Sequence, residues 1–184
     1  MLDLSKKYPR SISRNGMSIE LSVFTAEDID DVHQFACSLP EGDLQFLRID
    51  ITDRPTLERW ADSVSKGQRY TILARRDGKL VGYGSLNRRE LHWMRHLGEI
   101  RVIVSPEVRR IGLGALLASE TFDIARDLGL TKIVAQMARE QQGARKMFQD
   151  LGFAAEALLA DWVIDRDGKT RDMLIMSFDV TGLG

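Results

Sequence analysis

The feature that most constrains the fold is one stretch, residues 99–117, in which a strand pattern passes through two glycines into a helix pattern. β-branched residues dominate before Ser105, a composition typical of a buried strand: Ile100, Val102, Ile103 and Val104. After the glycines, hydrophobic positions recur at spacings of three and four, the stripe of an amphipathic helix: Leu113, Leu117, Thr121, Ile124 and Leu128. The stretch therefore predicts a strand, a tight turn and a helix in direct succession.

The turn itself has the composition of an anion site. It contains Pro106, Arg109, Arg110, Gly112 and Gly114. The first backbone N–H groups of a helix have no partner within the helix, and the positive end of the helix dipole lies beside them. Glycines let a phosphate approach that backbone closely, and the two arginines add full charges. This pattern indicates a phosphate-binding strand–turn–helix.

Composition limits the class of protein. The chain has 184 residues and a formal net charge of −1, which fits one domain and gives no support for nucleic-acid binding through a bulk positive field. Cys37 is the only cysteine and the three histidines are scattered, so we expect no disulfide and no metal site. The sequence has neither an apolar run of membrane-spanning length nor a signal-peptide pattern, so we expect a cytoplasmic protein that does not enter a membrane.

Hydrophobic periodicity divides the chain into an N-terminal arm, residues 1–16, and a single domain, residues 17–184. Strands are predicted at 17–25, 70–76, 80–86, 99–104, 132–137, 153–164 and 170–180, and helices at about 26–36, 56–65, 113–128 and 141–151. Asp77-Gly78 and the segment 165–169 predict two hairpin turns. Residues 40–55 read as an acidic loop with at most a short helical turn, and 88–97 as a connection. This order predicts a mixed sheet with helices on both faces.

Two segments together resemble the GNAT superfamily of acetyl-CoA-dependent N-acyltransferases. The turn from Arg109 to Gly114 is similar to the family's acetyl-CoA signature, and the segment from Gln141 to Phe153 is similar to its second cofactor helix. The two stand in the family's order and at roughly its separation, and the resemblance covers about residues 17–180. It implies an α/β (α+β) fold: a mixed, central splayed β-sheet of about seven strands flanked by helices on both faces.

The resemblance also implies how acetyl-CoA would bind. The strand before the turn splays from its neighbour, and backbone groups of Val102, Ile103 and Val104 pair with the pantetheine arm. The pyrophosphate lies on the turn and the first helical residues, and the second helix completes the site: Arg109, Arg110, Ile111, Gly112, Leu113, Gly114, Ala115, Gln141 and Phe148. A backbone N–H at Val104 or a neighbour would polarise the thioester carbonyl.

The residues for acid–base catalysis are less clearly indicated by the sequence than those for cofactor binding. An alkylamine is mostly protonated near pH 7, so a base is needed. Glu99 matches a position where several family members carry a catalytic glutamate, while its alternative role is a strand-end carboxylate paired with an arginine. His92 and His96 are the other candidates. Phe148 stands where the family usually has a tyrosine acid, so the thiolate would take its proton from water or from another tyrosine such as Tyr83.

The sequence thus leaves three functional hypotheses. The first is transfer of acetyl from acetyl-CoA to a primary amine of a small molecule in a ternary complex. The second is acetylation of a protein lysine or N-terminal amine. The third, supported by Phe148, is a coenzyme A-binding protein without turnover. The acidic loop, with Asp43, Asp50 and Asp53, either lines the acceptor entrance or is ordinary solvated loop, and the closing hairpin offers edges for a homodimer.

Overall fold

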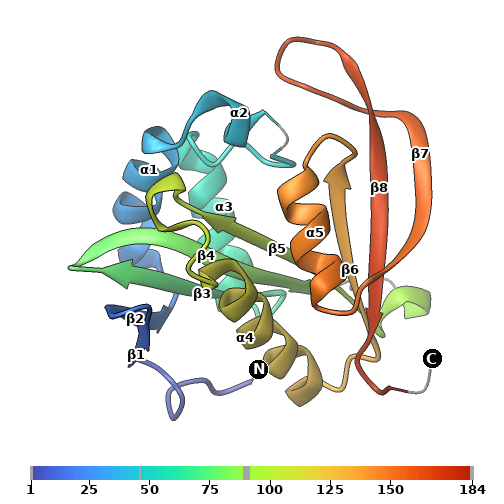
Figure 1. Ribbon diagram of the computed structural model, residues 1–184. Helices are drawn as coiled ribbons and strands as arrows, with labels where there is room; N and C mark the ends of the chain where they lie inside the picture. The colour runs from blue at the N-terminus through green and yellow to red at the C-terminus, as the bar shows by residue number, and fades with distance from the viewer. Residues whose placement is uncertain (1, 46, 89–91, 183–184) are drawn as a thin grey trace.

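The computed structural model describes residues 2–45, 47–88 and 92–182. Its centre is one eight-stranded sheet with the strand order β1-β2-β3-β4-β5-β6-β8-β7 (Figure 1). The strands are β1 (Arg10–Arg14), β2 (Met17–Val23), β3 (Arg69–Arg76), β4 (Lys79–Arg88), β5 (Leu97–Val104), β6 (Lys132–Ala138), β7 (Ala154–Ile164) and β8 (Thr170–Asp179). All neighbouring strands are antiparallel except β5 and β6, which are parallel. The predicted fold class is confirmed.

Helices cover both faces of the sheet, and a separate apolar cluster lies on each face. The α-helices are α1 (Ile29–Ser38), α2 (Glu41–Leu44), α3 (Arg54–Ser65), α4 (Leu113–Asp127) and α5 (Gln142–Asp150), and the short 3-10 turns are η1 (Ala26–Asp28), η2 (His92–Met94) and η3 (Pro106–Val108). On one face α4 and α5 bury Leu113, Leu117, Ile124 and Phe148. On the other, α1 and α3 bury Val32, Phe35, Leu57 and Trp60 against β3 and β4. Periodic apolar positions therefore define both layers, as the sequence pattern predicts.

Close packing at one glycine fixes α4 against the sheet. A Cβ added at Gly84 of β4 would lie 2.8 Å from the backbone oxygen of Leu117. Only the absence of a side chain allows this approach. The helix that follows the glycine turn is thus held directly over β4 and β5.

The sheet opens at its centre, between β5 and β6. These strands pair over only four positions, from Leu97 opposite Lys132 to Ile100 opposite Ala135. Beyond them, β5 continues to pair with β4 as far as Val104, and β6 continues to pair with β8 as far as Ala138. The two strands therefore diverge after Ile100, as the family resemblance leads one to expect.

The predicted N-terminal arm is wrong in one respect. Arg10–Arg14 forms β1 and pairs with β2, which adds an eighth strand to the seven expected. Leu4 and Tyr8 are buried in the core, and the Tyr8 hydroxyl donates a hydrogen bond to Glu120 of α4. The sequence signal is weak because only alternate residues of a short edge strand need to be apolar. The segment is part of the folded domain.

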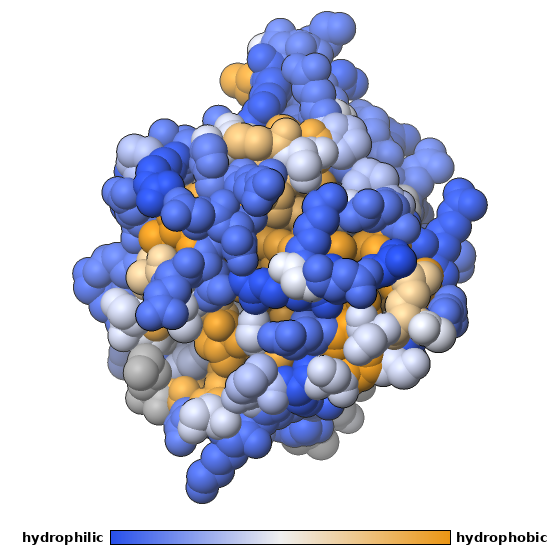
Figure 2. Space-filling view, turned by 90° about the vertical axis from the view of Figure 1, so that its left-hand side faces the viewer, coloured by the Kyte–Doolittle hydropathy of each residue, from blue (hydrophilic) through white to orange (hydrophobic). Residues whose placement is uncertain are grey.

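One side of the molecule is mostly polar. Figure 2 shows the side of the molecule beside β1 and β2, where apolar residues lie mainly in hollows between hydrophilic side chains. Within the described residues, no helix combines the length and apolar character needed to cross a membrane.

Candidate active site

The turn into α4 presents backbone N–H groups to solvent. Gly112 is the N-cap residue and has a φ of 80°, and Arg110 also lies in the left-handed region with a φ of 66°. No side chain among the described residues caps this helix, and its first backbone bond within the helix runs from Leu116 N–H to Gly112 C=O. A Cβ at Gly112 would meet nothing within 4 Å, so the space in front of the turn is open. This is the geometry of an anion site at a helix N-terminus.

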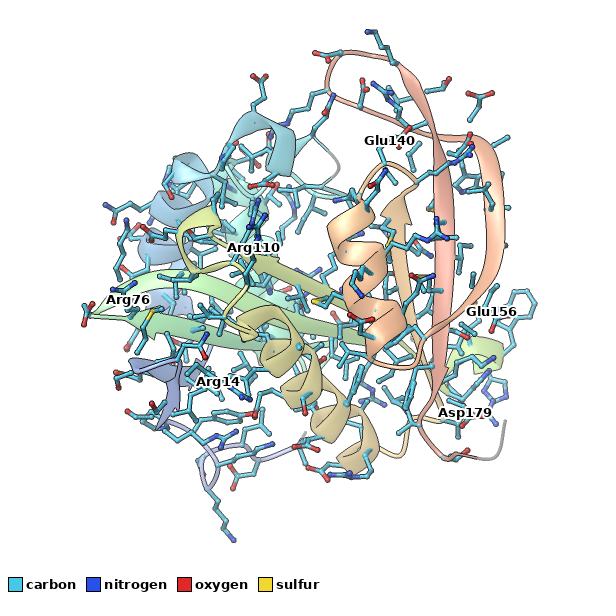
Figure 3. All side chains as sticks on the ribbon, viewed as in Figure 1. Arg14, Arg76, Arg110, Glu140, Glu156 and Asp179 are labelled. Atoms are coloured by element: carbon cyan, nitrogen blue, oxygen red, sulfur yellow. The ribbon has the colours of Figure 1, made fainter. Side chains whose placement is uncertain are left out.

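The two glycines of the turn have different roles. Gly112 supplies a positive φ, whereas Gly114 allows close packing, because a Cβ there would lie 2.9 Å from Met147 Sδ of α5 and 3.9 Å from Val102 Cγ1. The turn therefore bridges the diverging strand β5 and the helix α5. Figure 3 labels Arg110 in this turn, where it is exposed. Arg109 donates hydrogen bonds to the Val104 carbonyl and to Asp43 of α2.

The other predicted cofactor residues lie on β5 beyond its pairing with β6, in the turn, and on α4 and α5. Val102 and Val104 pack towards the α4 cluster and Ile103 towards the α1–α3 cluster, so all three are half-buried along the diverging strand. Ile111, Leu113 and Ala115 follow in the turn and first helical turn. Gln141 is the N-cap residue of α5, and its Oε1 accepts a hydrogen bond from Ala138 N–H at 3.0 Å. Phe148 lies in the core with its ring centroid 4.9 Å from that of Phe153, where it can donate no proton.

The face of the sheet below α3 carries two polar rows. Strand register aligns Arg69 of β3, Asn87 of β4 and Glu99 of β5 in the first row. In the second row it aligns Thr71, Ser85 and Arg101. Residues two apart on a strand share a face, so both rows point to the same side. All of these residues except Thr71 line a pocket of about 340 Å³, which we call the acceptor-side pocket. It is walled by α3 and the loop 47–51, and its lining residues are Leu47, Arg48, Ile49, Ile51, Trp60, Ser63, Gln68, Arg69, Tyr83, Ser85, Asn87, Arg88, Glu99 and Arg101.

Glu99 is the single carboxylate among the described residues of that pocket, and it is only 3% exposed. Arg48 Nη1 donates a hydrogen bond to its Oε2 at 2.6 Å, and Arg101 Nη2 to its Oε1 at 3.4 Å. The Arg48 side chain is half exposed, whereas Glu99 is held by the sheet. A carboxylate fixed by two arginines lies beside the point where β5 leaves β6.

A second pocket, of about 490 Å³, adjoins the first at the strand opening. It is lined from β5, β6, β7, β8, the end of α2 and the same loop, by Gln45, Leu47, Arg48, Arg101, Gln136, Met137, Ala138, Trp162, Val163, Ile164 and Met173. Leu47, Arg48 and Arg101 line both pockets. These three side chains therefore separate a chamber over the splayed strands from the chamber that contains Glu99.

Of the alternative acid–base residues, one lies in the acceptor-side pocket and two lie outside both pockets. Tyr83 is buried in the acceptor-side pocket, with its ring centroid 5.0 Å from that of Trp60, and burial raises the pKa of its hydroxyl. His92 and His96 are exposed and line neither pocket. Residues 89–91 of the predicted connection lie outside the described residues. The geometry brings Glu99 and Tyr83 together and leaves both histidines apart.

The acidic loop does not supply carboxylates to either pocket. Asp43 pairs with Arg109, Asp50 accepts from Arg166 Nη2 at 3.0 Å, and Asp53 caps α3 through the Thr56 N–H. Apart from Glu99, the charged residues that line the acceptor-side pocket are instead arginines: Arg48, Arg69, Arg88 and Arg101. Sequence reasoning missed them. Arg101 interrupts a mostly apolar strand, and Arg69 and Arg88 stand at the ends of two others, which is the signal that could have found them.

Comparison with known proteins gives the same fold. The sequence model of the acetyltransferase (GNAT) family matches residues 34–153. The chain is 30% identical over 110 residues to an L-amino acid N-acyltransferase of Escherichia coli, covering 59% of this chain and 63% of that protein. It is 30% identical over 92 residues to a mycothiol acetyltransferase of Thermomonospora curvata, covering 47% of this chain and 28% of that protein. The chain thus spans less than two thirds of the length of either curated relative.

Solved structures resemble almost the whole chain. A phosphinothricin acetyltransferase from Sinorhizobium meliloti in complex with AcCoA has a TM-score of 0.76 at 20% identity, covering 88% of each chain. A spermidine N-acetyltransferase from Vibrio cholerae in complex with CoA and spermine has a TM-score of 0.74 at 18% identity, covering 89% of this chain and 96% of that one. These likenesses establish the fold. Together with the family match over most of the chain, they show that this protein belongs to the acetyltransferase (GNAT) family.

Proposed function

We propose that the protein is an N-acetyltransferase that moves an acetyl group from acetyl-CoA to a primary amine of a small molecule, by direct attack in a ternary complex. The observation that carries this proposal is the position of Glu99. It is a buried carboxylate at the point where β5 leaves β6, and it lines a pocket that adjoins the opening. An amine in that pocket would face the opening between the strands, and a base is required there to remove its proton.

The residues around the opening fit acetyl-CoA. The uncapped N–H groups of residues 112–115 suit a pyrophosphate, with Arg109 and Arg110 as charged partners. The edge of β5 from Val102 to Val104, unpaired with β6, suits the amide groups of pantetheine. Acetyl-CoA supplies a thioester whose C–S bond breaks as the C–N bond forms, with coenzyme A leaving as a thiolate.

Groups of the protein then transfer the protons and position the two substrates. Glu99 accepts a proton from the acceptor ammonium, directly or through a water, and so leaves a neutral amine to attack; the second proton that the nitrogen loses after attack passes to water. A backbone N–H at Val104 or a neighbour polarises the carbonyl. The thiolate takes its proton from water or from Tyr83, which lines the same pocket as Glu99. Holding both substrates on one rigid sheet makes the attack effectively unimolecular, and this positioning supplies much of the rate.

The size of the acceptor-side pocket favours a small acceptor. Its volume of about 340 Å³ lies at the lower end of the range for small-molecule sites. A protein amino group is the alternative acceptor, and binding of coenzyme A without turnover is the alternative from another class. We also expect the protein to be cytoplasmic and to use no metal, and a homodimer stays a prediction.

The test is release of free thiol from acetyl-CoA by the purified chain with a panel of small amines and lysine peptides, beside calorimetry of acetyl-CoA binding. Thiol release with a small amine, and acetylated product in mass spectrometry, supports the proposal. Turnover with peptides alone favours the protein acceptor. Binding without release for any amine favours the non-catalytic alternative, and failure to bind acetyl-CoA rejects all three.

A further inference from the structure

The acceptor-side pocket is strongly basic, although the whole chain is nearly neutral. Its described lining contains four arginines, Arg48, Arg69, Arg88 and Arg101, and one carboxylate, Glu99. Arg48 and Arg101 already share that carboxylate. An amine that carries only positive charge would be repelled by such a lining. We propose that the acceptor carries an oxyanion group, such as a carboxylate, close to its amine, and that Arg69 binds this oxyanion. This inference rests on the proposed function.

Arg69 is the arginine best placed for an anion. Its Nε donates a hydrogen bond to Asn87 Oδ1, and its guanidinium lies 5.0 Å from the Trp60 ring centroid. None of the ion pairs between described residues includes it, unlike Arg48 and Arg101. The guanidinium is therefore fixed in the pocket by an amide and an aromatic ring, while its charge has no carboxylate partner there. A fixed planar donor with free N–H groups is suited to bidentate binding of an oxyanion.

The surroundings make that charge unfavourable without an anion. Burial is the main reason that the pKa of the Arg69 guanidinium is lowered; the charges of Arg101 and Arg48 lower it further, and Tyr83 and Glu99 offset part of this. An oxyanion bound beside Arg69 would offset both effects. A bound anion would thus add to the partial compensation that Glu99 already provides.

The strand register sets the distance between the two ends of the acceptor. Arg69 and Glu99 lie in one row, separated by Asn87. Two strand spacings put their Cα atoms about 10 Å apart, with both side chains on the same face. An acceptor between them would place its amine at Glu99 and its oxyanion at Arg69. A molecule with the two groups a few bonds apart, such as an amino acid, fits this arrangement and the pocket volume of about 340 Å³.

The first experiment compares matched amines by kcat/KM for thiol release. Each amino acid is measured beside its methyl ester, its decarboxylated amine and its aminophosphonate analogue. We expect the ester and the decarboxylated amine to be about 10²-fold poorer than the amino acid, because the pocket cation is left unpaired. Comparison of carboxylate with phosphonate identifies which oxyanion the pocket prefers. Equal rates for acid and ester would overturn the inference while leaving the acetyltransferase proposal intact.

The second experiment uses Arg69→Gln, Arg69→Lys and the control Arg14→Gln. Arg14 lies on the edge strand β1, is exposed and forms none of the ion pairs described, so its variant makes the same charge change away from the pocket (Figure 3). We expect Arg69→Gln to lower kcat/KM about 10²-fold for the amino acid and less than threefold for its ester. Arg69→Lys should recover part of the loss, because lysine restores the positive charge but not the planar guanidinium that can donate two parallel hydrogen bonds. An equal loss for acid and ester would assign Arg69 a structural role and reject the inference.

Calorimetry keeps the inference testable if no amine is acetylated. Binding of an amino acid or aminophosphonate to the wild-type protein, and its loss in Arg69→Gln but not in Arg14→Gln, would support the anion site although the proposed function had failed. Absence of such binding to the wild-type protein would overturn it.

Discussion

Replacement of Glu99 by glutamine isolates its proposed role as the base. The two side chains have nearly the same shape, so the change leaves no cavity in the sheet. Removing a general base lowers turnover by about 10²- to 10⁴-fold. This corresponds to about 3–5 kcal/mol of transition-state free energy. We expect kcat for the best amine to fall within that range.

The structural cost of the same change is smaller. Glu99 is 3% exposed, but its closer partner Arg48 has a side chain that is 54% exposed. Solvent screens such a pair, and the glutamine Oε1 can still accept from Arg48. The expected loss of stability is about 1 kcal/mol or less. For a domain of this length, that lowers Tm by about 2–4 °C.

Three measurements separate the two effects: thiol release, calorimetry of acetyl-CoA binding, and thermal unfolding. The matched control is Glu20→Gln, on the exposed face of β2. The reasoning requires that Glu99→Gln bind acetyl-CoA as the wild type does and remain folded while turnover collapses. It is refuted if kcat changes less than threefold, or if the Tm falls by more than 10 °C and so accounts for the loss by unfolding.

Three further predictions concern the turn, the α4 packing and the closing hairpin. Gly112→Val should weaken acetyl-CoA binding at least tenfold while the fold survives, because the residue has a φ of 80° but open space around its Cβ position; calorimetry beside circular dichroism checks this. Gly84→Ala should cost about 1–3 kcal/mol of unfolding free energy in a denaturant titration, because its Cβ would lie 2.8 Å from the Leu117 carbonyl oxygen. Asp165 is buried in the β7–β8 turn, where the Lys169 N–H above all, and then Arg171, lower the pKa of its carboxyl. Its stabilising contribution is present above its unfolded pKa of about 3.9 and is lost as pH falls through the lower folded pKa. The Tm difference between wild type and Asp165→Asn should therefore shrink in acid, and a difference that is constant from pH 7 to pH 2.5 would contradict this.

Sequence reasoning recovers the elements whose signals are local. The strand–turn–helix around Gly112 is encoded in consecutive residues, as is the hairpin at Asp77-Gly78. Each depends on backbone preferences and on contacts within one turn of chain. Such features can be predicted without knowing which elements meet in space.

The acceptor-side pocket depends on register instead. Arg69, Asn87 and Glu99 become neighbours only because β3, β4 and β5 pair in one particular alignment, and Arg48 reaches them from a loop. A single sequence contains no direct record of strand register. The sequence therefore left two roles open for the acidic residues of that loop, the acceptor entrance or ordinary solvated loop, and the structure shows their carboxylates paired outside the pocket.

The opening between β5 and β6 divides the sheet into two halves that share few strand-pairing positions. The half from β1 to β5 and the half from β6 to β8 share one four-position ladder, from Leu97 to Ile100, and their inner edges diverge beyond it. Any ligand that pairs with β5 and also contacts α5 would connect the two halves. A ligand present at a hundred times its Kd adds about 2.7 kcal/mol of stability by mass action. We expect such a ligand to slow the hydrogen exchange of amides on both sides of the opening together.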